Sequence, residues 1–147
     1  MKITDVLLGE HAVFYAQFDY LEQAIPAANS VTQVESLGAM LAAALASHAQ
    51  MEEELLFTTL EPHIGSMGPL AVMRTEHDEI EKSLERLPML REVDQVRELL
   101  LKVVTVAREH FPKEEQVLYP MANKTLSAET LIDLGAQWAA RRAITLV

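Results

Sequence analysis

The 147-residue sequence has no cysteine and few basic residues. Without cysteine, the chain forms no disulfide and offers no thiolate to an iron–sulfur cluster, which is consistent with a cytoplasmic location. With 12 Lys and Arg against 22 Asp and Glu, the net charge is −10. We therefore expect no binding of nucleic acid or of anionic membranes, since both need a basic face. No apolar run is long enough to span a bilayer, and early acidic residues argue against a signal peptide.

The remaining composition predicts an all-α fold, because half of the residues are apolar, only five are glycine, and the helical periodicities are long. We expect one domain over residues 1–147. An up-down-up-down four-helix bundle should occupy about residues 4–125. An additional C-terminal helix should follow at about 128–143, packed along the bundle or against a second subunit in a homo-oligomer.

Helix ends are indicated by capping residues and prolines. The first helix should stop near Pro26, and the second should begin at Ser30 or Thr32 and end before Pro62. Pro69 should open the third helix, which ends before Pro88. Asp94 and Ser127 are expected to cap the last two helices.

Ionisable residues interrupt the apolar face of every bundle helix. Each face carries one histidine, and the second and fourth helices add a glutamate four residues later. In an antiparallel bundle these six residues fall in roughly one layer: His11, His48, Glu52, His77, His110 and Glu114. Because a buried unpaired polar group costs about 1–3 kcal/mol, such a layer needs a partner. A divalent metal is the favoured interpretation, and a metal-free hydrogen-bonded network is the alternative.

The same residues form an internal repeat. An EH pair at residues 10–11 and again at 76–77 opens each half, and an HxxxEE phrase follows at residues 48–53 and 110–115. The halves are expected to be related helical hairpins that face each other across a pseudo-twofold axis. Residues four apart share one helix face, so each phrase can bind one metal through imidazole and reach a second through carboxylate. Mixed imidazole and carboxylate ligands suit iron, manganese or zinc.

These phrases resemble the hemerythrin-like (HHE cation-binding) domain family over about residues 4–125. The resemblance implies a non-heme di-iron centre of two iron ions joined by an oxo or hydroxo bridge. It assigns His11 and His48 to one iron, His77 and His110 to the other, and the bridging roles to Glu52 and Glu114. In this family an open iron position binds dioxygen or a related small molecule such as nitric oxide.

The sequence departs from the oxygen-carrying hemerythrins on the third helix. Those proteins have an HxxxH motif there, whereas His77 is followed by Glu81, which is either a replacement ligand or a solvated residue. His63 lies in the predicted loop, where a surface role is expected.

Three further features near the ligands have two interpretations each. Pro112 either opens the helix beside His110 or is a tolerated kink. Tyr15 either hydrogen-bonds a bound ligand or belongs to the core. Glu10 and Glu76 are either hydrogen-bond partners of the ligand histidines or ordinary surface charges.

Three functions fit this interpretation. The first is binding or sensing of oxygen, nitric oxide, peroxide or iron. The second is a di-iron enzyme that reduces peroxide or nitric oxide, or oxidises ferrous iron, so the sequence leaves enzymatic activity undecided. The third is repair of iron–sulfur or di-iron centres. We expect repair least, because family members that perform it carry an additional cysteine-bearing N-terminal segment.

Overall fold

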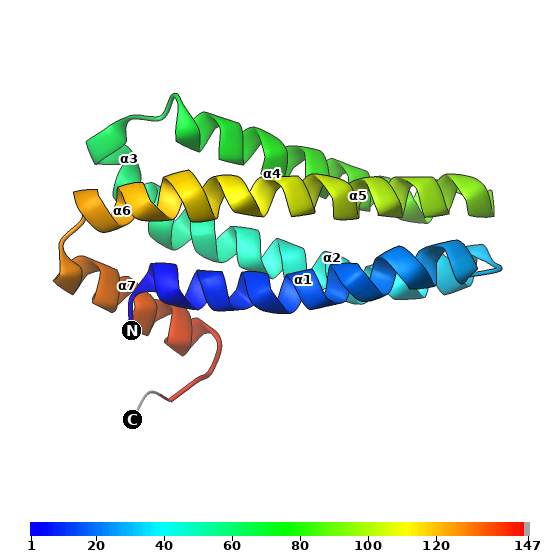
Figure 1. The fold of residues 1–147 in the computed structure, drawn as a ribbon, viewed down its shortest axis with the longest axis horizontal. Helices are drawn as coiled ribbons and strands as arrows, with labels where there is room; N and C mark the ends of the chain where they lie inside the picture. The colour runs from blue at the N-terminus through cyan, green and yellow to red at the C-terminus, as the bar shows by residue number, and fades with distance from the viewer. Residues whose placement is uncertain (146–147) are drawn as a thin grey trace.

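The computed structural model describes residues 1–145, and these contain helices and no strand. The longest helices run along the length of the molecule, as Figure 1 shows. They are α1 (Ile3–Ala27), α2 (Val31–Met51), α4 (Pro69–Arg86) and α5 (Val93–Lys113). Helix α1 packs against α2 and α5, and α4 packs against the same two helices. The predicted antiparallel four-helix bundle is therefore confirmed.

Two of the long helices continue past their α-helical ends. After α2 come the π-helical segment η1 (Glu52–Phe57) and α3 (Thr58–Ile64), and after α5 come the π-helical segment η3 (Glu114–Leu118) and α6 (Tyr119–Thr125). A 3₁₀ turn, η2 (Leu87–Met89), follows α4. The second helical run thus ends at Ile64, beyond the expected stop, and Pro62 lies inside α3.

Most of the expected capping is observed. Ser30 accepts a hydrogen bond from the Gln33 amide at 3.3 Å, and Ser127 accepts one from the Thr130 amide at 3.0 Å. The prediction for Asp94 is wrong, because Glu92 holds the N-cap position and Asp94 lies in the first turn of α5. The loop before α4 turns at two glycines with positive φ, 81° at Gly65 and 71° at Gly68, a conformation that other residues rarely adopt.

The two π-helical segments shift the buried face of each helix by one residue. In a π-helix each amide bonds the carbonyl five residues earlier, as the Thr58 amide does with Glu53 and the Tyr119 amide with Glu114. A regular α-helical count buries Thr59, Val117 and Met121. The structure instead buries the residue after each: Leu60, Leu118 and Ala122.

The C-terminal helix α7 (Ala128–Arg141) packs along the bundle against α1, beside the N-terminus (Figure 1). Leu131 and Leu134 are buried in this interface. A Cβ atom at Gly135 would overlap the carbonyl oxygen of Met1, so the close approach of the two segments requires glycine there. Association of chains through this helix stays a prediction.

Apolar side chains form two separate clusters inside the bundle. One contains Phe14, Phe18, Leu45 and Ile80, and the other contains Leu7, Met51, Leu70 and Met73, each with further residues. Along α1 and α4, the buried histidines 11 and 77 lie between residues of the two clusters. The predicted polar layer is therefore enclosed between two apolar regions. No helix within residues 1–145 is long and apolar enough to cross a membrane.

Candidate metal centre

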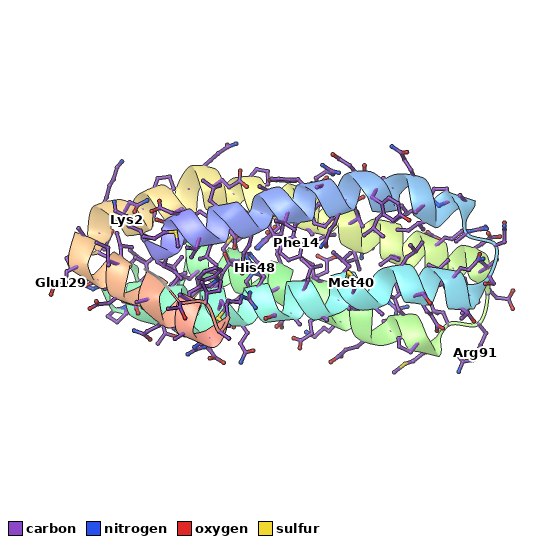
Figure 2. All side chains as sticks on the ribbon, turned by 90° about the horizontal axis from the view of Figure 1, so that it is seen from below. Lys2, Phe14, Met40, His48, Arg91 and Glu129 are labelled. Atoms are coloured by element: carbon purple, nitrogen blue, oxygen red, sulfur yellow. The ribbon has the colours of Figure 1, made fainter. Side chains whose placement is uncertain are left out.

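Four buried histidines, one from each long helix, meet at the centre of this layer. His11 lies on α1, His48 on α2, His77 on α4 and His110 on α5, and none is more than 8% exposed. His48 is only 2% exposed, whereas Met40 on the same helix is 75% exposed; Figure 2 labels both residues. The histidines come from helices that pack side by side, so the layer predicted from the sequence exists.

Each histidine donates its Nδ1 hydrogen to a glutamate at the edge of the layer. The four glutamates, called here the outer glutamates, are Glu10, Glu53, Glu76 and Glu115. The Nδ1–Oε distances are 2.7 Å for His48–Glu10, 2.8 Å for His77–Glu53, 2.7 Å for His110–Glu76 and 2.9 Å for His11–Glu115. Because an ionised carboxylate only accepts hydrogen bonds, these contacts place the hydrogen of every neutral imidazole on Nδ1.

In the neutral form of the histidines, the Nε2 atoms consequently face inward as acceptors without a hydrogen, in two pairs. His11 Nε2 lies 3.1 Å from His48 Nε2, and His77 Nε2 lies 3.1 Å from His110 Nε2. Two lone pairs at this distance repel each other unless a cation or a proton lies between them. The structure therefore creates two neighbouring positions that each favour a positive charge.

Two further glutamates, the inner glutamates Glu52 and Glu114, connect the two pairs. Glu52 Oε2 lies 3.4 Å from His48 Nε2 and 3.3 Å from His77 Nε2. Glu114 places Oε2 3.2 Å from His11 Nε2 and Oε1 3.0 Å from His110 Nε2. Each inner glutamate thus reaches both histidine pairs, as a bridging carboxylate must.

Both inner glutamates are completely buried. Glu52 Oε2 and both carboxylate oxygens of Glu114 have no hydrogen-bond partner within the described residues. Buried carboxylate oxygens without hydrogen bonds are costly, so these atoms are available for a cation.

The π-helical segments start at the inner glutamates, which gives the two halves the same local geometry. Segment η1 begins at Glu52 and η3 at Glu114. Pro112 precedes η3 by two residues, but the equivalent residue before η1 is Gln50. The π-helical turn therefore forms without a proline, and of the two interpretations of Pro112 the tolerated one fits better.

Without a metal, the carboxylates control the charge of the histidines. Burial opposes a charged imidazole, but the inner and outer glutamates outweigh it, raising the pKa of His77 to about 12 and also raising the pKa of His48 and His110. Burial likewise opposes ionisation of Glu114, but the nearby His11, His110 and His77 rings hold its pKa well below the usual range. In the metal-free layer, the charged His48, His77 and His110 therefore lie close to the ionised carboxylate of Glu114.

One aromatic position distinguishes the two halves of the site. Tyr119 donates its hydroxyl hydrogen to Glu52 Oε1 at 2.6 Å, and its oxygen lies 3.1 Å from His11 Nε2. The equivalent residue in the first half is Phe57, which stacks on His77 with ring centroids 5.6 Å apart but has no hydroxyl group. At this position the His11/His48 pair therefore has a tyrosine hydroxyl beside it, whereas the His77/His110 pair has a phenyl ring.

The C-terminal helix also contacts this half of the site through an outer glutamate. Glu10 Oε1 accepts hydrogen bonds from Trp138 Nε1 at 3.1 Å and from Arg142 Nε and Nη2 at 3.0 and 2.7 Å. Glu10 in turn holds His48. Trp138 and Arg142 are thus connected to the centre through one carboxylate.

The alternatives left open by the sequence have structural answers. Glu10 and Glu76 are hydrogen-bonded to the histidines, so the surface-charge interpretation is wrong. Tyr15 donates to the outer Glu115 at 3.1 Å. Glu81 is exposed and lies outside the two groups of residues that could hold a metal. His63 is exposed too, near the end of α3 and not in a loop.

The sequence interpretation missed half of the outer glutamates. Glu53 and Glu115 are the second glutamates of the two HxxxEE phrases, and each holds a histidine of the opposite half. The doubling of the glutamate in both phrases was the available signal. The contacts of Trp138 and Arg142 had no such signal, because they depend on how α7 packs.

A cleft of about 670 Å³ between α2 and α4 reaches the centre from outside. His48, His77 and His110 line it, whereas His11 does not. The remaining walls are mostly apolar on the inside and acidic at the edge. The apolar residues include Ala42, Leu45, Ala46, Ala49, Ile80 and Leu84. The acidic residues are Glu53, Glu54, Asp78, Glu81 and Glu85. Small molecules therefore have a route from the surface to the histidines.

The residues present fit a pair of metal ions. Two groups of four buried residues each bring one ligand atom per residue within 4.8 Å of the others: His11, His48, Glu52 and Glu114, and Glu52, His77, His110 and Glu114. Both groups combine imidazole with carboxylate, a donor set that suits iron, manganese or zinc. The outer glutamates supply the second contact that metal-binding histidines commonly make.

Comparison with known proteins agrees with this arrangement. The family model described as the Hemerythrin HHE cation binding domain matches residues 2–122. Over 48 residues the chain is 46% identical to the iron-sulfur cluster repair protein YtfE of Escherichia coli (strain K12 / DH10B) and to that of Shigella boydii serotype 18 (strain CDC 3083-94 / BS512). These matches cover 31% of this chain but only 22% of each relative. No solved structure matches the chain significantly.

Proposed function

Because the chain belongs to the hemerythrin HHE cation-binding family, we propose that it holds two iron ions in one dinuclear centre and binds a small molecule there. His11 and His48 hold one ion, and His77 and His110 hold the other. Glu52 and Glu114 bridge the two. The observation that supports this most directly is the facing of the Nε2 atoms at 3.1 Å in both pairs.

The protein's own residues prepare the centre in three ways. The outer glutamates fix each imidazole with Nε2 free for a metal and make it a stronger donor. The buried inner glutamates add two negative charges, which offset part of the charge of two divalent ions. The apolar clusters on both sides exclude bulk water, which strengthens every electrostatic contact within. When bound, the iron ions supply redox chemistry and a position for dioxygen or nitric oxide.

The cleft between α2 and α4 supports a small and uncharged ligand. Its inner walls are mainly alanine, leucine and isoleucine, and its edge carries carboxylates. An anionic ligand would meet those carboxylates before it reached the histidines. Dioxygen, nitric oxide and hydrogen peroxide carry no charge and are small enough for such a path.

Metal analysis of the purified, iron-loaded protein tests the centre. We expect close to two iron ions per chain, and His110→Ala should lower that number. The exposed His63→Ala is the matched control and should retain full loading. Full loading in His110→Ala as well would refute the ligand assignment.

Oxygen titration separates a binding protein from an enzyme. Binding or sensing predicts that the visible spectrum of the reduced protein returns when oxygen is removed. Irreversible oxidation, with turnover of added peroxide or nitric oxide, would instead identify a di-iron enzyme.

The similarity to iron-sulfur cluster repair proteins favours repair as a second candidate function. In that case the iron-loaded chain should restore the cluster absorption of an oxidatively damaged iron–sulfur protein. A metal-depleted sample of the same chain is the control. Equal recovery with both samples would exclude this function.

A further inference from the structure

The outer glutamates are not held equally. Glu10 is fixed by Trp138 and Arg142, and its side chain is 17% exposed. Glu115 accepts the Tyr15 hydroxyl and is 24% exposed.

On the other pair, Glu76 is paired with Lys113 and is 18% exposed. Glu53 is 43% exposed, and within residues 1–145 its carboxylate accepts a hydrogen bond from His77 only. His77 is therefore the histidine whose orientation depends on the least restrained partner.

Contacts on the inner side follow the same division. The His11/His48 pair is covered by Phe111, whose ring stacks on His11 at 3.9 Å, and by the hydroxyl of Tyr119. Phe57, the counterpart of Tyr119, stacks on His77 at the same centroid distance of 5.6 Å as Tyr119 on His11, but it has no hydroxyl group. The position that corresponds to Phe111 in the first half is Ala49, which has no ring. His77 is also the most exposed of the four histidines, at 8%.

The cleft opens on the less restrained pair. Both histidines of that pair, His77 and His110, line it, and Glu53 stands among its walls. The other pair contributes only His48, because His11 is enclosed between α1 and the rings around it. The cleft thus reaches the centre at His77, the histidine whose hydrogen-bond partner is the least restrained of the four outer glutamates.

We propose that the two metal positions exchange at different rates. The ion held by His77 and His110 enters and leaves through the cleft between α2 and α4, and the ion held by His11 and His48 is retained. Release begins when Glu53 turns toward solvent and frees the His77 ring. This inference rests on the dinuclear centre proposed above and adds an inequality between its two positions.

Metal release into an excess of a chromogenic chelator measures the exchange directly. The protein is loaded anaerobically with two ferrous ions per chain and mixed with the chelator in a stopped-flow instrument. We expect two phases of one ion each, with rates that differ at least tenfold. Glu53→Gln should accelerate the fast phase about tenfold or more, as expected for loss of a glutamate that orients a ligand, and leave the slow phase unchanged.

Matched variants locate the effect. Glu10→Gln removes the charge from the equivalent hydrogen-bond partner of His48 and should accelerate the slow phase alone. Ala46→Phe fills the cleft from α2 and should slow the fast phase several-fold. Ala43→Phe places the same ring on an exposed position of α2 that does not line the cleft, and should leave both phases as in wild type.

The outcomes distinguish this inference from the proposed function. Release of both ions in one phase, or equal acceleration of both phases by Glu53→Gln, would overturn the inference and leave the dinuclear centre intact. Equal slowing by Ala43→Phe and Ala46→Phe would overturn the assigned path. A wild-type protein that never holds two ions per chain would refute the dinuclear centre itself.

Discussion

Raising the pH should destabilise the metal-free protein, because three of its buried histidines are charged in the folded state. His48, His77 and His110 all have raised pKa values, that of His77 reaching about 12. In the unfolded chain a histidine titrates near pH ~6.5. The stabilisation from each is present in full below that pH and is lost progressively as the pH rises toward the folded pKa.

The magnitude follows from counting protons. One histidine that is charged in the fold and neutral in the unfolded chain lowers the free energy of unfolding by about 1.4 kcal/mol per pH unit. Three such histidines give an upper limit of about 4 kcal/mol per pH unit above pH ~6.5. Two pH units would remove most of the ~5–15 kcal/mol that stabilises an ordinary domain.

Acid should destabilise the metal-free protein for the opposite reason. Burial tends to raise the pKa of Glu10, Glu76 and Glu114, but the neighbouring histidines and cations lower it. Their contribution is present above the unfolded pKa of ~4.3 and is lost as the pH falls through the folded values. We therefore expect maximal stability between about pH 4.5 and 6.5.

Metal should reverse the trend above neutral pH. A metal binds Nε2 only after its proton has left, so each released proton raises the apparent affinity about tenfold per pH unit. Since binding to the native state adds to the free energy of unfolding, the loaded protein should keep its stability where the metal-free protein loses it.

Urea denaturation between pH 4 and pH 9 tests this prediction, once with chelator and once with zinc, which has no redox chemistry. His77→Gln should reduce the slope of the metal-free curve above pH 7 by about 1.4 kcal/mol per pH unit. If the free energy of unfolding of the metal-free protein stays level or rises between pH 6.5 and 8.5, the histidines are not protonated in the folded state. That result would also refute the assigned hydrogen-bond pattern.

Two further predictions concern single side chains. Tyr119→Phe removes the hydrogen bond to the buried carboxylate of Glu52 and should lower metal-free stability by about 1.5–3 kcal/mol, measured by urea denaturation with chelator; an unchanged midpoint would contradict that bond. Gly135→Ala drives a methyl group into the Met1 carbonyl and should cost about 1–3 kcal/mol. Gly9→Ala, with no atom within 4 Å on the exposed face of α1, should stabilise by about 0.5–1 kcal/mol in the same assay, and equal effects of both substitutions would contradict the close packing of α7.

The sequence was sufficient to predict the bundle and to select the six residues that meet at its centre. Apolar periodicity identifies the buried face of a helix, and a histidine or glutamate on that face stands out. The repeat strengthened the selection, because His48 and Glu52 recur as His110 and Glu114 in the same spacing. Their assembly into one layer then followed from antiparallel packing.

The π-helical turns were not predictable from periodicity alone. A count at 3.6 residues per turn runs through Glu114 to Val117, yet Val117 is 48% exposed. One additional residue per π-helical turn moves Leu118 into the core instead. Where the additional residue is inserted depends on which carbonyl each backbone amide hydrogen-bonds. The pattern of apolar and polar side chains does not determine this choice.

The outer glutamates escaped prediction for a different reason. Glu53 and Glu115 stand next to the inner glutamates and therefore point about a quarter-turn away from the apolar face. Such a position is normally solvated. These two glutamates become hydrogen-bond partners only because a neighbouring helix places a histidine beside each: α4 places His77 beside Glu53, and α1 places His11 beside Glu115.

The crossed pattern of these contacts has a consequence for the ancestry of the chain. The first hairpin holds a histidine of the second through Glu53, and the second holds one of the first through Glu115. Two identical copies of one hairpin would therefore complete the same set of contacts as a homodimer, with both metal positions equal. Joining the copies in a single polypeptide permits each to diverge. The phenylalanine at position 57 and the tyrosine at position 119 are such a divergence, and it is available only to a fused chain.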